Sequence, residues 1–228
     1  MAGLAPLRFE NVGDMAAAVK EEFPAPTLST TVFEASDGLA PAGGPSVTMG
    51  AWGSRPFNAE GYTHPHSEWM AVTEGSVTVA AGGKEKLYTK GDIFLIPKGT
   101  TYDWKMTEDF KKFFVIVDHA EPETPPTEVI SYDKAQPCAG DEEYWFFCTG
   151  PEDLAPGSAV PTAASHGYMT SSCGQFSAGL WTCTAHETVV GEYPVHEFIH
   201  LLEGSIILTV DGEEHVFEAG DAFFIPRE

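Results

Sequence analysis

The chain repeats itself at a constant offset of 129 residues, as Trp52 and Trp181 or Glu68 and Glu197 show. Further pairs are Pro65 with Pro194, Gly75 with Gly204, Gly91-Asp92 with Gly220-Asp221, Phe94 with Phe223, Ile96 with Ile225 and Pro97 with Pro226. Because unrelated segments would not keep one register across turns and strands, this repeat predicts a duplicated domain. Residues kept in both copies are scaffold candidates, whereas residues found in one copy are candidates for chemistry.

Short runs with a period of two in apolar residues begin at Val47 and are separated by glycines. In the first copy they predict strands over 47–52, 68–73, 76–80, 86–89, 92–96 and 113–117. In the second copy they predict strands over 144–149, 175–185, 198–202, 205–210, 213–217 and 221–225. A short helix is expected over 14–23 and a long loop over 150–174. Strands of this length and spacing are typical of an all-β barrel or sandwich.

The domain plan follows from the repeat and from one segment rich in proline. It comprises an N-terminal extension (1–46), an N-terminal barrel (47–120), a Pro-rich linker (121–128) and a C-terminal barrel (129–228). The second copy stops at Glu228, before the counterpart of the strand that closes the first copy at 111–117. Either the N-terminal segment supplies a missing strand, or the chain ends before it.

Composition excludes several classes of partner. A net charge of -22 argues against nucleic acid or an anionic membrane surface. No segment resembles a secretory signal or a membrane-spanning helix. The four cysteines form no C-x-x-C pair, which argues against zinc-ribbon or thioredoxin chemistry. We therefore expect a cytoplasmic protein with reduced thiols.

One cluster of polar residues in the first copy points to chemistry. Tyr62, His64, His66 and Glu68 alternate along the sequence, so an extended chain would place them on one side. Two imidazoles and a carboxylate that converge inside a barrel form a candidate site for a first-row divalent metal. The alternative is that these histidines lie at the surface or are hydrogen-bonded in the core.

The conserved spacings resemble those of the cupin superfamily, whose motifs are G-x5-H-x-H-x3-4-E-x6-G and G-x5-P-x-G-x2-H-x3-N. Glu68 and Gly75 fit the first motif, while Gly91, Pro97 and Gly99 fit the second. The resemblance implies an all-β chain of two tandem jelly-roll cupin barrels (double-stranded β-helix) and a homodimer. Flanking Gly-x-Trp and Tyr-Asp-Trp segments are similar to the branch of ethanolamine-utilisation and ureidoglycine-type cupins.

The chain also departs from the family motifs. His64 and Glu68 remain as ligands, but Tyr62 and Tyr102 stand where the family has histidines, and His66 is an additional imidazole. This pattern disfavours a three-histidine iron dioxygenase. The resemblance carries over His64 and Glu68 as ligands, and the alternating pattern adds His66. Together they form the candidate site for a divalent metal such as Mn, Zn, Ni or Fe.

The second copy departs further, because Tyr193 stands at the position of His64. We expect no metal there and interpret this barrel as structural support. Glu197 survives and needs a partner if it is buried, and Arg227 or a tyrosine could provide one. Trp52 and Trp181 are interpreted as core aromatics. Lys111-Lys112 is expected to be solvated, although the resembled branch of cupins often places a lysine near this point.

These observations leave two functions open. In the first, the N-terminal barrel binds a small polar metabolite in a metal-dependent hydrolase-, aminohydrolase- or isomerase-like reaction, with Glu68 as metal ligand or general base. The second is a non-catalytic metabolite-binding or accessory cupin without turnover. In both, the ligand contacts are Tyr62, Tyr102 and Trp104, beside His64, His66 and Glu68. A purely structural role is disfavoured, because packing alone does not need H-x-H-x-E.

Overall fold

The computed structural model describes residues 6–18, 25–35, 46–119, 126–136, 138, 153–172, 174, 176–189, 191, 193 and 195–227. Most of the predicted linker 121–128 and the predicted strand 144–149 lie outside these residues. The chain forms an N-terminal unit (Phe9–Asp133 with Thr170–Phe176) and a C-terminal unit (Met1–Arg8, Lys134–Met169 and Ser177–Glu228). Among the described residues, the helical structure is η1 (Met15–Ala17), and no helix is long and apolar enough to cross a membrane. The all-β prediction is confirmed.

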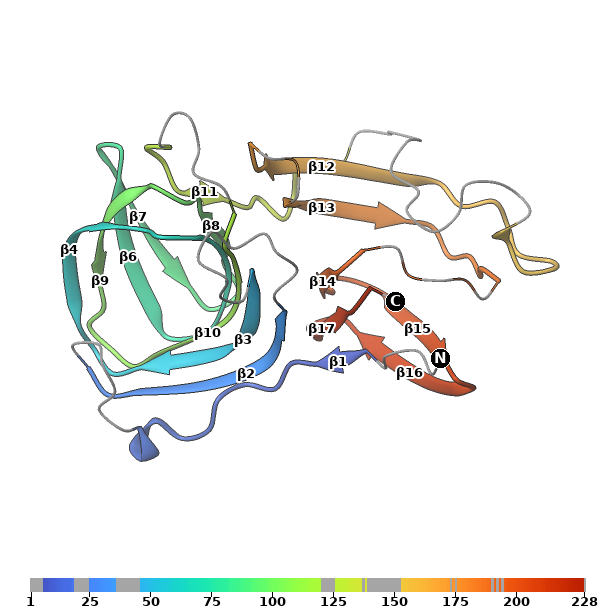
Figure 1. Cartoon of the computed structure of the whole chain (residues 1–228), viewed down its shortest axis with the longest axis horizontal. Coiled ribbons are helices and arrows are strands. Elements are labelled where there is room, and N and C mark those ends of the chain that lie inside the picture. The colour runs from blue at the N-terminus through green and yellow to red at the C-terminus, as the bar shows by residue number, and fades with distance from the viewer. Residues whose placement is uncertain are drawn as a thin grey trace. The chain divides into compact units, whose positions relative to one another are not determined.

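The N-terminal unit is a barrel of two curved sheets (Figure 1). One sheet has the order β11-β8-β5-β10-β3-β2 and the other has the order β4-β9-β6-β7. The bounds are β2 (Thr27–Ala35), β3 (Val47–Ser54), β4 (Asn58–Thr63), β5 (Ser67–Glu74), β6 (Ser76–Ala81), β7 (Lys84–Thr89), β8 (Ile93–Ile96), β9 (Thr101–Lys105), β10 (Phe110–Val117) and β11 (Ile130–Ser131). The predicted strands of this copy are therefore found, each within a few residues.

Apolar side chains from both sheets fill the barrel. Alternate residues of each strand point inward, so β5 contributes Met70 and Val72 while β6 contributes Val77 and Val79. The predicted runs do not include β2, β4, β9 and β11. β2 lies within the predicted N-terminal extension, yet it pairs with β3 from end to end. Its sequence Thr-Leu-Ser-Thr-Thr has little apolar alternation and therefore does not predict a strand. The segment becomes a strand because it pairs with β3.

The glycines and aspartates shared by both copies lie in turns. Gly91 and Gly220 have φ of 89° and 97°, a backbone region that favours glycine. The aspartate after each glycine accepts the backbone N–H of the residue three positions earlier, at 2.8 Å in both copies. Gly75 has φ of 74°, and a Cβ there would lie 2.0 Å from the carbonyl oxygen of Asp109. The interpretation of Gly-Asp as a turn is therefore confirmed.

The described residues of the C-terminal unit form three small sheets. Their strands are β1 (Leu7–Arg8), β17 (Ala222–Ile225) and β14 (Glu197–His200); β12 (Ala163–Thr170) and β13 (Ser177–Cys183); and β15 (Ser205–Val210) and β16 (Glu213–Glu218). Two expectations are wrong here. The predicted loop 150–174 contains β12, which pairs with β13. Trp181 is 55% exposed rather than a core aromatic, because the part of this unit that the structure describes leaves its face of β13 uncovered.

The N-terminal segment contributes a strand to the C-terminal unit. β1 pairs with β17, placing Leu7 opposite Phe224, and β11 pairs with β8 in the same antiparallel register, placing Ile130 opposite Leu95. Since Phe224 and Leu95 are 129 residues apart, β1 is the counterpart of β11 in the second copy. Arg8 stabilises this strand in two ways. It forms an ion pair with Asp221 at 2.5 Å, and its guanidinium lies over the Phe217 ring in a cation–π contact.

Candidate functional site

The centre of the candidate site is a buried ion pair between neighbouring strands of the N-terminal barrel. Glu68 on β5 shares the inward face of Met70 and Val72, and Lys112 on β10 lies opposite Val72. The Nζ atom of Lys112 donates to Oε1 of Glu68 at 2.7 Å, and each side chain is 9% exposed. Such a pair costs desolvation on both sides, so the surroundings must compensate it.

The ammonium of Lys112 is enclosed by aromatic and sulfur groups. It lies 5.1 Å from the centroid of the Trp52 ring and 5.5 Å from that of Trp104. Its Nζ atom is 3.0 Å from Sδ of Met70. Indole faces attract a cation through their quadrupole, more strongly where water is excluded. We call Trp52, Glu68, Met70 and Trp104 the ammonium cage.

His64 connects this ion pair to Tyr102 on β9. Nε2 of His64 lies 3.3 Å from Oε2 of Glu68, and Nδ1 lies 3.1 Å from the hydroxyl oxygen of Tyr102. The backbone of His64 is fixed as well, because its N–H donates to Thr100 at 2.9 Å and its carbonyl accepts from Gly99 at 2.8 Å. The result is a continuous row of polar contacts through four side chains in an apolar barrel.

Opposing effects set the ionisation of the two acidic groups. Burial by itself would raise the pKa of the Glu68 carboxyl, but the Lys112 ammonium and His64 outweigh it and lower the pKa from 4.5 to about 2. Burial raises the pKa of the Tyr102 phenol well above its ordinary value, and the charge of Glu68 adds to this. At neutral pH, Glu68 is therefore ionised and Tyr102 keeps its proton.

The structure gathers some of the predicted site residues and separates others. Tyr62 stands edge-on to His64 and Tyr102, with ring centroids 6.2 and 5.8 Å away. Trp104 contacts the ammonium and so belongs to the centre. His66, in contrast, is not brought to Glu68: its Nδ1 atom lies 3.6 Å from Oδ1 of Asp118.

A second polar network explains where His66 goes. Asp118 also accepts from Nζ of the buried Lys98 at 2.8 Å, and that same Nζ donates to the carbonyl oxygen of His119 at 2.6 Å. Nε2 of His119 lies 2.8 Å from the hydroxyl of Ser67. Pro65 separates His66 from His64, and the two imidazoles end in different surroundings. The expected convergence of all four alternating residues is therefore wrong for His66.

Lys112 is the residue that sequence reasoning missed, since the pair Lys111-Lys112 was expected to be solvated. The Lys111 side chain is 12% exposed and pairs with the exposed Glu74 at 2.9 Å, whereas Lys112 is 7% exposed and pairs with the buried Glu68. A signal was present in the sequence. Two consecutive residues of a strand point to opposite faces, so in a strand buried on both faces one lysine has to enter the barrel.

The described residues do not fit a divalent metal at this centre. Among them, no group of three or more histidines, cysteines, aspartates or glutamates is placed to hold one. Glu68 and His64 provide two candidate ligands, and a zinc site takes at least three from the protein. The Lys112 ammonium already lies 2.7 Å from Glu68, where a metal bound to this carboxylate would have to compete with it.

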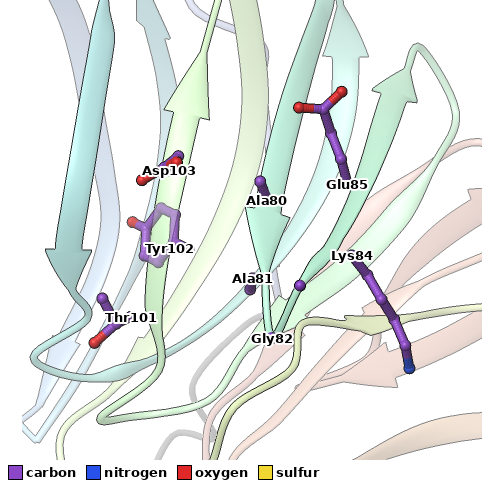
Figure 2. A pocket seen from close by; sticks show the side chains of 9 residues that line it. Ala80, Ala81, Gly82, Lys84, Glu85, Thr101, Tyr102 and Asp103 are labelled. Atoms are coloured by element: carbon purple, nitrogen blue, oxygen red, sulfur yellow. The ribbon is translucent and has the colours of Figure 1, made fainter.

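A surface depression of about 380 Å³ lies outside this centre, at the β6–β7 turn and the start of β9 (Figure 2). Its lining includes Gly82, Lys84 and Asp103, together with Tyr102. Neither Glu68 nor its partners line it, and the Tyr102 side chain is 8% exposed. We therefore assign the site to the buried row of polar side chains and not to this depression.

The second copy keeps the glutamate but changes its partner. Tyr193 donates to Oε2 of Glu197, as expected for a buried acid paired with a tyrosine. Burial raises the pKa of Glu197, and the Tyr193 hydrogen bond offsets this only in part. The same scaffold position thus holds a carboxylate of lowered pKa in one unit and of raised pKa in the other.

Comparison with known proteins identifies the family. The family model of the EutQ-like cupin domain matches residues 42–114 and 170–228. A DUF861-family protein of unknown function from Pseudomonas syringae pv. tomato str. DC3000 has a TM-score of 0.71 and 19% identity, over 86% of this chain and 77% of its own. A Pseudomonas aeruginosa protein described as glyoxylate-induced has a TM-score of 0.52 and 12% identity, over 91% of this chain and 75% of its own.

The Clostridium difficile EutQ protein has a TM-score of 0.33 and 14% identity, over 42% of this chain and 65% of its own. Curated protein sequences give no match. The structural likenesses, at low identity, concern the fold. The family model covers more than half of the chain in two segments, one for each copy of the repeat. The chain therefore belongs to the family of EutQ-like cupin domains.

Proposed function

We propose that the N-terminal barrel binds a small polar metabolite beside Tyr102 and His64 and supports proton transfer to it without a metal. The observation that carries this proposal is the buried row from Lys112 through Glu68 and His64 to Tyr102. Buried polar groups cost free energy, and an apolar barrel of this size packs without them. Perturbed ionisable groups gathered in this way are typical of functional sites.

The ionisation states assign roles to the three groups nearest the ligand. Tyr102 keeps its proton, so its hydroxyl donates to Nδ1 of His64 or to an acceptor atom of a bound ligand. When Tyr102 donates to Nδ1 of His64, that nitrogen is the acceptor, and the proton of the ring lies on Nε2, which faces the ionised Glu68 at 3.3 Å. A carboxyl with a pKa of about 2 is a weak base, so Glu68 orients His64 and Lys112 instead of taking a proton.

The neighbouring residues limit the size of the ligand. The barrel interior is filled by the apolar core, and Tyr62 is the half-buried ring that adjoins both His64 and Tyr102. A ligand of few atoms placed at Tyr62 meets a proton donor and a proton acceptor together. This arrangement supports isomerase-like proton transfer better than a hydrolysis that requires metal-activated water.

The test is a binding screen of small polar acids, amides and amino alcohols, followed by thermal shift and calorimetry. A compound bound at the site should bind about tenfold more weakly to Tyr102→Phe, because one hydrogen bond is lost. Tyr88→Phe is the matched control, since Tyr88 is a buried tyrosine of the same barrel that bonds Ser131 at 2.6 Å instead. Equal loss in both variants, or no loss in Tyr102→Phe, would contradict the proposal.

A further inference from the structure

The ammonium cage around Lys112 resembles a binding site for a free cation. Its four members come from the two strands that flank β10 in one sheet and from one strand of the other sheet: Trp52 on β3, Glu68 and Met70 on β5, and Trp104 on β9. They provide one negative charge, two indole faces and a soft sulfur. Such surroundings suit a primary ammonium group, because it donates hydrogen bonds to acceptors and is attracted by π faces. A metal ion, in contrast, needs several lone pairs that coordinate it.

The same surroundings suit a divalent metal poorly. Mn²⁺ and Zn²⁺ prefer nitrogen and oxygen ligands, and neither an indole face nor an indole N–H supplies a lone pair. Nε1 of Trp104 is itself a donor and points to Sδ of Met106 at 2.8 Å. Of the two nitrogens of His64, Nδ1 is already beside the hydroxyl of Tyr102.

We propose that the ammonium of Lys112 takes the place of a bound metal in this barrel, and that the cage selects ammonium over divalent cations. The cage would then bind a free primary ammonium once Lys112 is shortened. Lys112→Ala removes three methylene groups and the ammonium, which together have the shape of n-propylammonium. The ligand class is therefore a short primary alkylammonium. This inference concerns the cation of the centre and does not depend on the metabolite proposed above.

The experiment supplies the missing fragment to the full-length Lys112→Ala protein. Thermal and urea unfolding are measured with n-propylammonium chloride, with n-propanol as its neutral analogue, and with MnCl2 or ZnCl2, all at matched ionic strength. We expect n-propylammonium at ten times its dissociation constant to raise the folded-to-unfolded ratio about tenfold. Wild type and Lys111→Ala are controls, since Lys111 pairs with Glu74 outside the cage, and neither should respond.

Three outcomes overturn the proposal: n-propanol stabilises as well as n-propylammonium, a divalent metal stabilises more, or the folded variant responds to none of them. If Lys112→Ala does not fold alone, it is refolded with n-propylammonium, and failure to recover structure also refutes the idea. Lys112→Met offers a second check, because its side chain fills the space without a charge and should abolish the response. Failure of the metabolite screen would leave all of these results unchanged, so the two proposals fail separately.

Discussion

Replacing Glu68 by glutamine tests the central ion pair most directly. The substitution keeps the size of the side chain but removes the charge that faces Lys112 at 2.7 Å and His64 at 3.3 Å. A buried ammonium is then left without a counter-charge. Removing one partner of a buried pair typically costs ~3–5 kcal/mol, whereas an exposed pair is worth less than ~1 kcal/mol.

The pH dependence of stability gives a second value for the free energy that the charge of Glu68 contributes to folding. Because the pKa of Glu68 is lowered from 4.5 to about 2, its stabilising contribution is fully present above pH 4.5 and is lost as the pH falls toward 2. The lowering corresponds to ~3 kcal/mol at neutral pH, in agreement with the estimate for a broken buried pair. The wild type should therefore lose stability in this acid range, and Glu68→Gln should lose correspondingly less.

Urea unfolding followed by tryptophan fluorescence at pH 7 and at pH 3 measures both effects, since Trp52 and Trp104 adjoin the pair. Glu74→Gln is the matched control, because the Glu74 side chain that pairs with Lys111 is 54% exposed and its substitution should cost less than ~1 kcal/mol. If Glu68→Gln unfolds within ~1 kcal/mol of the wild type at pH 7, Glu68 and Lys112 are not the buried pair on which the site rests. The double variant Glu68→Gln with Lys112→Met should recover much of the loss, because neither charge is then unpaired.

Three further predictions concern the scaffold. Gly75→Ala should destabilise the N-terminal unit by more than ~1 kcal/mol in urea unfolding, because φ is 74° and the new Cβ would meet the Asp109 carbonyl at 2.0 Å. Arg8→Ala should speed amide hydrogen exchange in β17 and leave β8 unchanged, because only β1 loses its ion pair and ring contact. Tyr193→Phe should raise the pKa of Glu197 further, so the variant should lose more stability than wild type in thermal unfolding as the pH rises above 4.5, and an equal loss would contradict the contact.

The fold was largely predictable because the repeat and the turn residues are local signals. Gly91 and Gly220 mark positive φ angles, and period-two alternation marks strands whose two faces differ, so both could be read without coordinates. β2 and β12 were missed, since their polar sequences become strands through pairing with β3 and β13. Strand propensity of this kind depends on the neighbour and not on the segment itself.

The candidate site was predicted in part. His64, Glu68 and Tyr102 were identified from motif positions, and they do lie together. His66 was grouped with them because the alternation of a regular strand was extended across Pro65, where the chain had not yet entered β5. Lys112 was expected to be solvated because lysine side chains usually lie at the surface. This tendency does not take into account which face of a strand points into the barrel, and Lys112 is on that face and buried.

The sequence by itself determined that this chain is a duplicated cupin, because the motif residues serve turns whose geometry is set within a few residues. It also placed the candidate site in the first copy, because Tyr193 stands at the position of His64 in the second copy. Only the tertiary structure decided that a lysine from β10 reaches Glu68, and that Leu7 and Arg8 pair with β17 in the second copy. Both contacts join residues far apart in the sequence, 44 positions for Lys112 and Glu68, and pairing over such distances is established by the closure of the sheets.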